Sequence, residues 1–183
     1  STTPRSSCLY INDWHDTVKD MVSAREYVVR KYPNLPIYLL GFSLGSFIVR
    51  TNADLTPYKK EILIGTGAQS AFLMRIMRTW IGKKYTGKMS CASDKIYDLM
   101  SGTYGKKFKG RPSNYWLLTD NEKRREYADD SLARQDVSPA FFCEFSKGME
   151  CASRNLKNPN NTIPTLFLYG KKDPVSGFGK GIR

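Results

Sequence analysis

Long apolar runs and paired-cysteine motifs are both missing from this sequence of 183 residues. No stretch approaches the ~18–20 consecutive apolar residues that a membrane-spanning helix needs, and residues 1–10 lack the apolar segment of a secretion signal. The four cysteines, Cys8, Cys91, Cys143 and Cys151, show neither zinc-knuckle spacing nor the density of a small disulfide-linked scaffold. We therefore expect a soluble, cytoplasmic protein that uses no metal and no other cofactor.

Acidic residues are scarce beside basic ones. The chain has 17 Asp and Glu against 29 Lys and Arg, a formal net charge of +12, which favours anionic partners such as nucleic acid, phospholipid surfaces or acidic substrates. The basic residues of 68–150 are scattered and match no nucleic-acid-binding motif. A solvated basic surface is the simplest interpretation. We expect no nucleic-acid partner, and we leave open a peripheral contact with an anionic membrane; the oligomeric state stays undetermined.

Apolar residues alternate between helical spacing and short continuous runs. Helical spacing extends over 13–31, with Asn12 or Asp13 as a plausible N-cap and Pro33 just beyond the end. The short runs, bounded by glycine or proline, are typical of strands buried on both faces of a parallel sheet. The expected order is helix 13–31, strand 37–40, helix 46–53, strand 61–65 and strand 165–169. This order predicts an α/β protein.

About a hundred residues separate the second of these strands from the third, far more than the few that normally join neighbouring parallel strands. They must form an inserted subdomain. Helical spacing recurs at 71–83, 92–100, 120–127 and 139–151, and 102–111 looks like a loop. We therefore predict a partial core formed by 1–67 and 151–183, and an inserted, mainly helical lid formed by 68–150.

The motif with the clearest chemistry is Gly41-Phe42-Ser43-Leu44-Gly45. A strand pattern enters it and a helix-compatible segment leaves it, which is the context of a nucleophile elbow. Such a sharp turn exposes the serine hydroxyl above the sheet, and the two flanking glycines allow close packing there. The following helix directs its positive end at the site. We therefore predict Ser43 as the nucleophile and the amide of Leu44 as an oxyanion donor.

These residues make the chain similar to the lysophospholipase and monoacylglycerol-lipase-like α/β hydrolases, often grouped as serine aminopeptidase S33. The resemblance covers nearly the whole chain. It rests on 37–47, on Ile64-Gly65-Thr66-Gly67, on Trp116-Leu117, and on 168–175 with its Gly-x-x-Asp-Pro turn. It implies an α/β-hydrolase fold, a mostly parallel sheet with a helical cap. It also implies that Asp173 is the acid of a catalytic triad, although a turn or cap aspartate is the alternative.

The sequence departs from this family pattern at the base. The triad histidine should follow Asp173, yet the only histidine, His15, precedes Ser43 on a predicted helix, where we expect an ordinary surface or half-buried residue. The family's first strands and its second oxyanion amide would precede Ser1. We therefore expect a fragment that does not hydrolyse esters by itself.

Three functions from different classes remain open for the intact protein. The favoured one is hydrolysis of lipid-like carboxylic esters, such as monoacylglycerols or lysophospholipids, through an acyl-enzyme on Ser43. Aromatic and apolar residues of 68–150 could line an acyl-chain tunnel or simply pack the lid. The second is an aminopeptidase or iminopeptidase, which would want an acidic pocket that this basic lid does not suggest. The third is a non-catalytic binding protein with a hydrolase fold.

Overall fold

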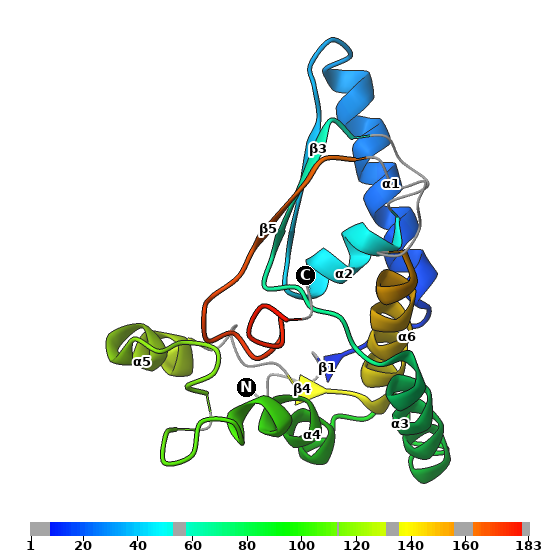
Figure 1. Cartoon of the computed structure of the whole chain (residues 1–183). Helices are drawn as coiled ribbons and strands as arrows, with labels where there is room; N and C mark the ends of the chain where they lie inside the picture. Colours follow the sequence, from blue (N-terminus) through cyan, green and yellow to red (C-terminus); the bar gives the residue numbers. More distant parts are fainter. Residues whose placement is uncertain (1–7, 53–57, 113, 131–135, 156–162, 181–183) are drawn as a thin grey trace, which may run out of the picture.

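A computed structural model describes residues 8–52, 58–112, 114–130, 136–155 and 163–180 (Figure 1). Within these residues no helix is both long and apolar enough to cross a bilayer.

Most expected elements of the α/β part are confirmed. Helix α1 (Trp14–Lys31) is capped by Asp13, whose side chain accepts a hydrogen bond from the amide of His15. Strand β2 (Tyr38–Phe42) leads into helix α2 (Leu44–Thr51), and strands β3 (Lys60–Ile64) and β5 (Thr165–Leu168) follow. The observed α2 begins two residues earlier than the pattern indicated. Consequently only Ser43 separates β2 from α2.

The three strands form one parallel sheet in the order β2-β3-β5. The register pairs Phe42 with Ile64 and Ile64 with Leu168, so the carboxyl ends of all three strands lie at the same edge. The chain leaves β3 and returns to β5 only after the whole insert. This arrangement confirms the predicted α/β class with a parallel sheet.

The two faces of this sheet differ, which corrects the expectation that its strands are buried on both sides. On one face, α2 packs so closely that a Cβ at Gly41 would lie 2.8 Å from the carbonyl oxygen of Gly45, and the neighbouring Leu63 is 1% exposed. On the other face, Leu40 and Phe42 are 58% and 63% exposed. Figure 1 shows α1 and α2 on one side of the strands only. The described residues thus cover one face and leave the other bare.

The insert is mainly helical, as expected. Its elements are α3 (Ala71–Lys84), α4 (Asp94–Gly105), α5 (Asn121–Asp129) and α6 (Pro139–Asn155). The predicted loop at 102–111 is wrong over its first four residues, because α4 continues through Gly105 despite two glycines. The two-residue strands β1 (Cys8–Leu9) and β4 (Asp136–Val137) pair in parallel and were not expected. A two-residue strand is too short to leave a recognisable alternation.

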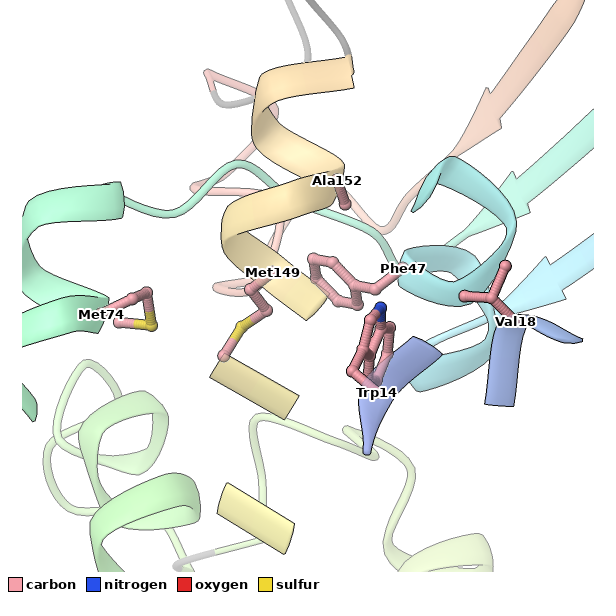
Figure 2. Close-up of a cluster of buried hydrophobic side chains, with 6 residues drawn as sticks. All are labelled: Trp14, Val18, Phe47, Met74, Met149 and Ala152. Atoms are coloured by element: carbon pink, nitrogen blue, oxygen red, sulfur yellow. The ribbon is translucent and has the colours of Figure 1, made fainter. Parts of the chain in front are cut away.

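A cluster of buried side chains joins the insert to the α/β part (Figure 2). Its members come from α1, α2, α3 and α6: Trp14, Val18, Phe47, Met74, Met149 and Ala152. A Cβ at Gly148 would collide with the Trp14 ring, so α6 lies directly against the start of α1. Glu144 also accepts a hydrogen bond from the Trp14 amide at 2.9 Å. Helix α6 runs through residue 150, and the proposed domain division there stays a prediction.

Candidate active site

Ser43 forms the whole connection between β2 and α2. Its backbone has φ 49° and ψ −117°, a conformation that costs a non-glycine residue about 1–3 kcal/mol. The strain is held by hydrogen bonds: the Ser43 amide donates to the Ile64 carbonyl at 2.9 Å, and the Ser43 carbonyl accepts from the amide of Ser46 at 2.9 Å. Ser43 is exposed. This is the tight turn that the motif predicted, with a serine presented at the carboxyl edge of the sheet.

The two glycines of the motif are in different situations. A Cβ at Gly41 would lie 2.8 Å from both the Gly45 carbonyl oxygen and the Ser46 Cα, both of which are backbone atoms. A Cβ at Gly45 would meet nothing within 4 Å. Close packing therefore requires glycine at position 41. At position 45 the described residues leave room for a side chain.

Leu44 is the first residue of α2, so its amide has no acceptor within the helix. The positive end of the α2 dipole faces the same region. The Leu44 side chain packs against a second buried cluster of the insert, which consists of Ile81, Ile96, Val137, Phe141, Phe142 and Cys143. The predicted oxyanion donor is thus bordered by apolar side chains from α3, α4 and α6.

Asp173 lies in a compact turn after β5. Its amide donates to the Gly170 carbonyl at 2.9 Å, and its carbonyl accepts from the Phe178 amide at 3.0 Å. Its Oδ1 accepts from the Val175 amide at 2.8 Å, a turn interaction that would by itself account for an aspartate here. Its Oδ2 has no hydrogen-bond partner among the described residues. That oxygen is available to a group at the carboxyl edge.

The sheet brings Ser43 and the Asp173 turn to the same edge. Ser43 follows the last residue of β2, and the turn follows β5, with β3 between them. Because neighbouring strands lie about 4.8 Å apart, the ends of β2 and β5 are roughly 10 Å apart. An imidazole with a hydrogen bond of about 2.8 Å on either side spans a gap of comparable size.

No histidine lies in that gap. His15 is exposed in the first turn of α1, as expected for an ordinary helix residue. The neighbouring Trp14 donates through its indole Nε1 to the Thr51 hydroxyl at 3.1 Å, which places the start of α1 beside the last residue of α2. Ser43 lies at the other end of that helix, about 12 Å away. His15 is therefore badly placed to act as the base.

The structure also brings Tyr104 of α4 to the Asp173 turn. Burial raises the pKa of the Tyr104 hydroxyl, and the negative charge of Asp173 raises it further. The Tyr104 ring packs on Trp116 with centroids 5.1 Å apart. Sequence reasoning missed this residue because it assigned the end of α4 to a loop. To find Tyr104, one would have had to extend the predicted helix through Gly102 and Gly105, and glycine disfavours a helix.

A buried arginine connects the elbow helix with the turn after β3. Arg50 is 3% exposed and donates to the Thr66 hydroxyl at 2.8 Å, the Gly67 carbonyl at 2.6 Å and the Ala152 carbonyl at 3.0 Å. Burial lowers the pKa of its guanidinium to about 10. A Cβ at Gly67 would collide with the Val175 carbonyl. Arg50 thus holds the loop on which the Asp173 turn rests.

The apolar residues of the insert that could line an acyl-chain tunnel differ in how deeply they are buried. Phe141 and Phe142 are buried in the cluster that borders Leu44, whereas Phe72 and Trp80 are 74% and 51% exposed on α3.

Among the described residues, no three histidine, cysteine or carboxylate side chains lie close enough together to hold a metal ion.

Solved structures with the same fold come from lipases and esterases. A lipase in its open form has a TM-score of 0.73 at 19% identity, with 91% of this chain and 56% of that chain covered. A thermostable carboxyl esterase from Bacillus coagulans has a TM-score of 0.68 at 16% identity, covering 87% of this chain and 64% of that chain. A monoglyceride lipase variant from Saccharomyces cerevisiae has a TM-score of 0.61 at 15% identity, covering 96% of this chain and 56% of that chain.

This chain therefore spans less than two thirds of the length of these structures. At such identities the likeness shows a shared α/β-hydrolase fold. No curated protein sequence matches the chain. The family model described as "Serine aminopeptidase, S33" matches residues 5–181, nearly the whole chain. The chain accordingly belongs to the serine aminopeptidase S33 family and contains part of the α/β-hydrolase fold.

Proposed function

We propose that the whole protein is a serine hydrolase that cleaves carboxylic esters of lipid-like substrates, of the monoacylglycerol-lipase or lysophospholipase type. The observation that carries the proposal is the strained, exposed Ser43, with the Asp173 turn at the same edge of the sheet. The lipases and esterases of the same fold support it. Residues 68–150 would serve as the lid.

In the proposed reaction, Ser43 Oγ attacks the ester carbonyl carbon while its proton passes to a base. The carbonyl oxygen becomes an oxyanion that accepts a hydrogen bond from the Leu44 amide; one such donor is worth about 10²–10³ in rate. The bond to the alcohol then breaks, and the base returns the proton to the leaving alcohol. Water repeats the sequence on the acyl-enzyme and releases the acid.

The base in this scheme is a histidine held by Asp173. His15 stands at the far end of α2, so we propose that the histidine is supplied by residues beyond these 183. The apolar cluster beside Leu44 favours an acyl chain on that side of Ser43. The protein needs no cofactor for this chemistry.

A peptidase of the aminopeptidase type is the second candidate, because the family description names that activity. Such an enzyme binds the free amine of its substrate, which calls for carboxylates near Ser43. Lys107 instead lies over the Phe178 ring beside the Asp173 turn, and Lys171 and Lys172 are exposed in the turn itself. These cations favour the ester hydrolase.

A fluorophosphonate probe and two substrate series test the proposal on the complete protein. We expect the probe to label Ser43 and monoacylglycerols to be turned over, with both signals lost in Ser43→Ala. The 183-residue chain alone should show no ester turnover. Preference for aminoacyl amides would favour the peptidase, and an unlabelled Ser43 would support a non-catalytic binding protein.

A further inference from the structure

We propose that Arg50 is a positioning residue for the reaction at Ser43, because it fixes the Asp173 turn relative to the helix that follows the nucleophile. Arg50 lies in the last turn of α2, at the end remote from Ser43, and is 3% exposed. It therefore reaches the site only through other residues. The inference rests on the proposed ester hydrolysis, and it assigns to Arg50 an effect on the chemical step and none on substrate binding.

The Arg50 guanidinium is held in one orientation. One of its terminal nitrogens donates to both the Thr66 hydroxyl and the Gly67 carbonyl, and the other donates to the Ala152 carbonyl. The guanidinium carbon lies 5.5 Å from the centroid of the Phe47 ring. Its pKa of about 10 keeps the group charged at neutral pH, so these hydrogen bonds are stronger than those of a neutral donor. The planar guanidinium thus fixes the loop after β3 against α2 and α6.

The loop after β3 in turn supports the Asp173 carboxylate. A Cβ at Gly67 would collide with the Val175 carbonyl, so the two backbones are in direct contact. The amide of Val175 donates to Asp173 Oδ1 at 2.8 Å. Val175 therefore contacts the loop through its carbonyl and holds the carboxylate through its amide. Any shift of the loop reaches the carboxylate through this one residue.

This chain of contacts refers both reacting groups to α2. Ser43 directly precedes the helix, and its amide donates to the Ile64 carbonyl at the end of β3. The Asp173 turn lies beyond the sheet: among the described residues, the last hydrogen bond from the β3 side reaches the Leu168 carbonyl. The sheet alone therefore does not fix the carboxylate. Arg50 adds the missing support from the same helix that begins at the elbow.

Support of this kind acts on the rate of the chemical step. The base can take the Ser43 proton only while Asp173 holds it in the correct orientation. A displacement of about 1 Å caused by a remote substitution can cost about 100-fold in rate. Because Arg50 is buried, its loss leaves the contacts of the bound substrate unchanged. An interaction that is felt only in the transition state lowers kcat and kcat/KM equally when it is removed.

The first test measures turnover of 1-oleoylglycerol by the complete protein, with each rate divided by the amount of Ser43 that a fluorophosphonate labels at completion. In Arg50→Met, which lacks the donors, kcat per labelled site should fall about 10–100-fold while KM stays within about twofold. An unchanged kcat, or a raised KM with kcat unchanged, would overturn the inference. If Arg50→Met does not fold, Arg50→Lys replaces it, with the same split at about fivefold, because one ammonium cannot reproduce the guanidinium fork.

The matched control is Asn155→Ala. The Asn155 amide donates to the backbone carbonyls of Arg50 and Thr51, both at 2.9 Å, so its loss weakens the same end of α2 and leaves the loop after β3 untouched. This variant should unfold at a lower urea concentration, yet its kcat per labelled site should match that of the wild type. A fall in its kcat as large as that of Arg50→Met would show that any loosening of α2 slows the reaction, and would overturn the inference.

A second comparison separates positioning from a general structural role. In Asp173→Asn the carboxylate is already lost, so adding Arg50→Met should slow the labelling of Ser43 by less than about threefold. In the wild-type background the same substitution should slow labelling about tenfold or more. Equal factors in the two backgrounds would mean that Arg50 does not act through Asp173, and the inference would be wrong.

The inference and the proposed function can fail separately. If the complete wild-type protein neither cleaves the ester nor is labelled at Ser43, the proposed function fails, and amide hydrogen exchange then decides the placement of the turn. The Val175 amide, which is bonded to Asp173, should exchange about tenfold or more faster in Arg50→Met than in the wild type or in Asn155→Ala. Equal exchange in the three proteins would overturn the inference, and the expected difference would support it.

Discussion

The two faces of the β2-β3-β5 sheet both carry leucine but have opposite surroundings. Leu63 faces α2 and is 1% exposed, whereas Leu40 and Leu166 on the opposite face are 58% and 52% exposed. Parallel sheets are ordinarily covered on both faces. Of the two faces, we therefore expect the one on which α2 packs to contribute more to stability. The turn at Ser43 joins β2 to that same helix.

The largest expected change in stability is at Gly41, where β2 and α2 make their closest backbone contact. Gly41→Ala should cost about 4 kcal/mol or more in unfolding free energy, because its Cβ would meet backbone atoms at 2.8 Å that cannot turn aside. Gly45→Ala is the matched control and should stabilise by about 0.5–1 kcal/mol, since alanine is the better helix former and its Cβ meets nothing. Urea denaturation of the purified chain measures both. Equal effects would show that the sheet and α2 are less tightly packed than described.

A leucine pair compares the faces directly. Leu63→Ala should cost about 3 kcal/mol, as expected for a fully buried leucine, because it leaves a cavity under α2. Leu40→Ala should cost less than about 1 kcal/mol, because most of that side chain is already in water. The difference between the two midpoints in urea is the measurement. A Leu40→Ala cost close to that of Leu63→Ala would mean that the bare face is covered in solution.

Substitutions of two buried glutamates, Glu61 and Glu150, should change the free energy of unfolding by smaller amounts that depend on pH in opposite ways. Glu61, on the covered face, is 2% exposed; burial raises the pKa of its carboxyl above the ordinary 4.5, while a hydrogen bond from Thr165 partly offsets this. The folded state then holds the proton more tightly than the unfolded state, so stability falls as pH rises above that value. Glu61→Gln should therefore stabilise by about 1 kcal/mol at pH 8 and make no difference near pH 3.5.

Glu150 on α6 should behave in the opposite way. Arg75 and Arg78 donate to it at 2.6 Å and 3.2 Å, and the hydrogen bonds from Arg75 are the main cause that lowers the pKa of its carboxyl. Its stabilising contribution is present above the ordinary pKa and is lost as pH falls through the lowered one. Because Arg75 is largely exposed, Glu150→Gln should cost only about 1 kcal/mol at pH 7, and less at pH 3. Thermal or urea unfolding across this range checks the sign for both glutamates.

Local signals were enough to predict the helices and strands of the α/β part and the turn at Ser43. Amphipathic spacing identified α1, and a short apolar run followed by Gly-x-Ser-x-Gly identified β2, the elbow and α2. Three elements were not predicted because their sequence patterns are weak. Strands β1 and β4 have two residues each, and the end of α4 contains glycines, which helices usually avoid. These elements exist because neighbours pack on them.

The candidate site was predictable only in part. Ser43 and Asp173 follow recognisable motifs, and the family resemblance indicated the pairing, but the distance between them depends on the strand order with β3 in the middle. Arg50 was unpredictable, because a charged residue on a short helix normally faces solvent. Its burial results from α6 and the loop after β3 closing over it with three hydrogen-bond acceptors.

The sequence by itself determined the α/β class, the strained serine turn and the excess of positive charge, because each depends on residues close together along the chain. Only the tertiary structure decided that the described residues leave one face of the sheet uncovered, that Gly41 but not Gly45 is sterically required, and that Lys107 lies over the Phe178 ring beside the Asp173 turn. Those features depend on contacts between residues far apart in the chain, and a pattern read along one segment contains no information about which distant segment will pack against it.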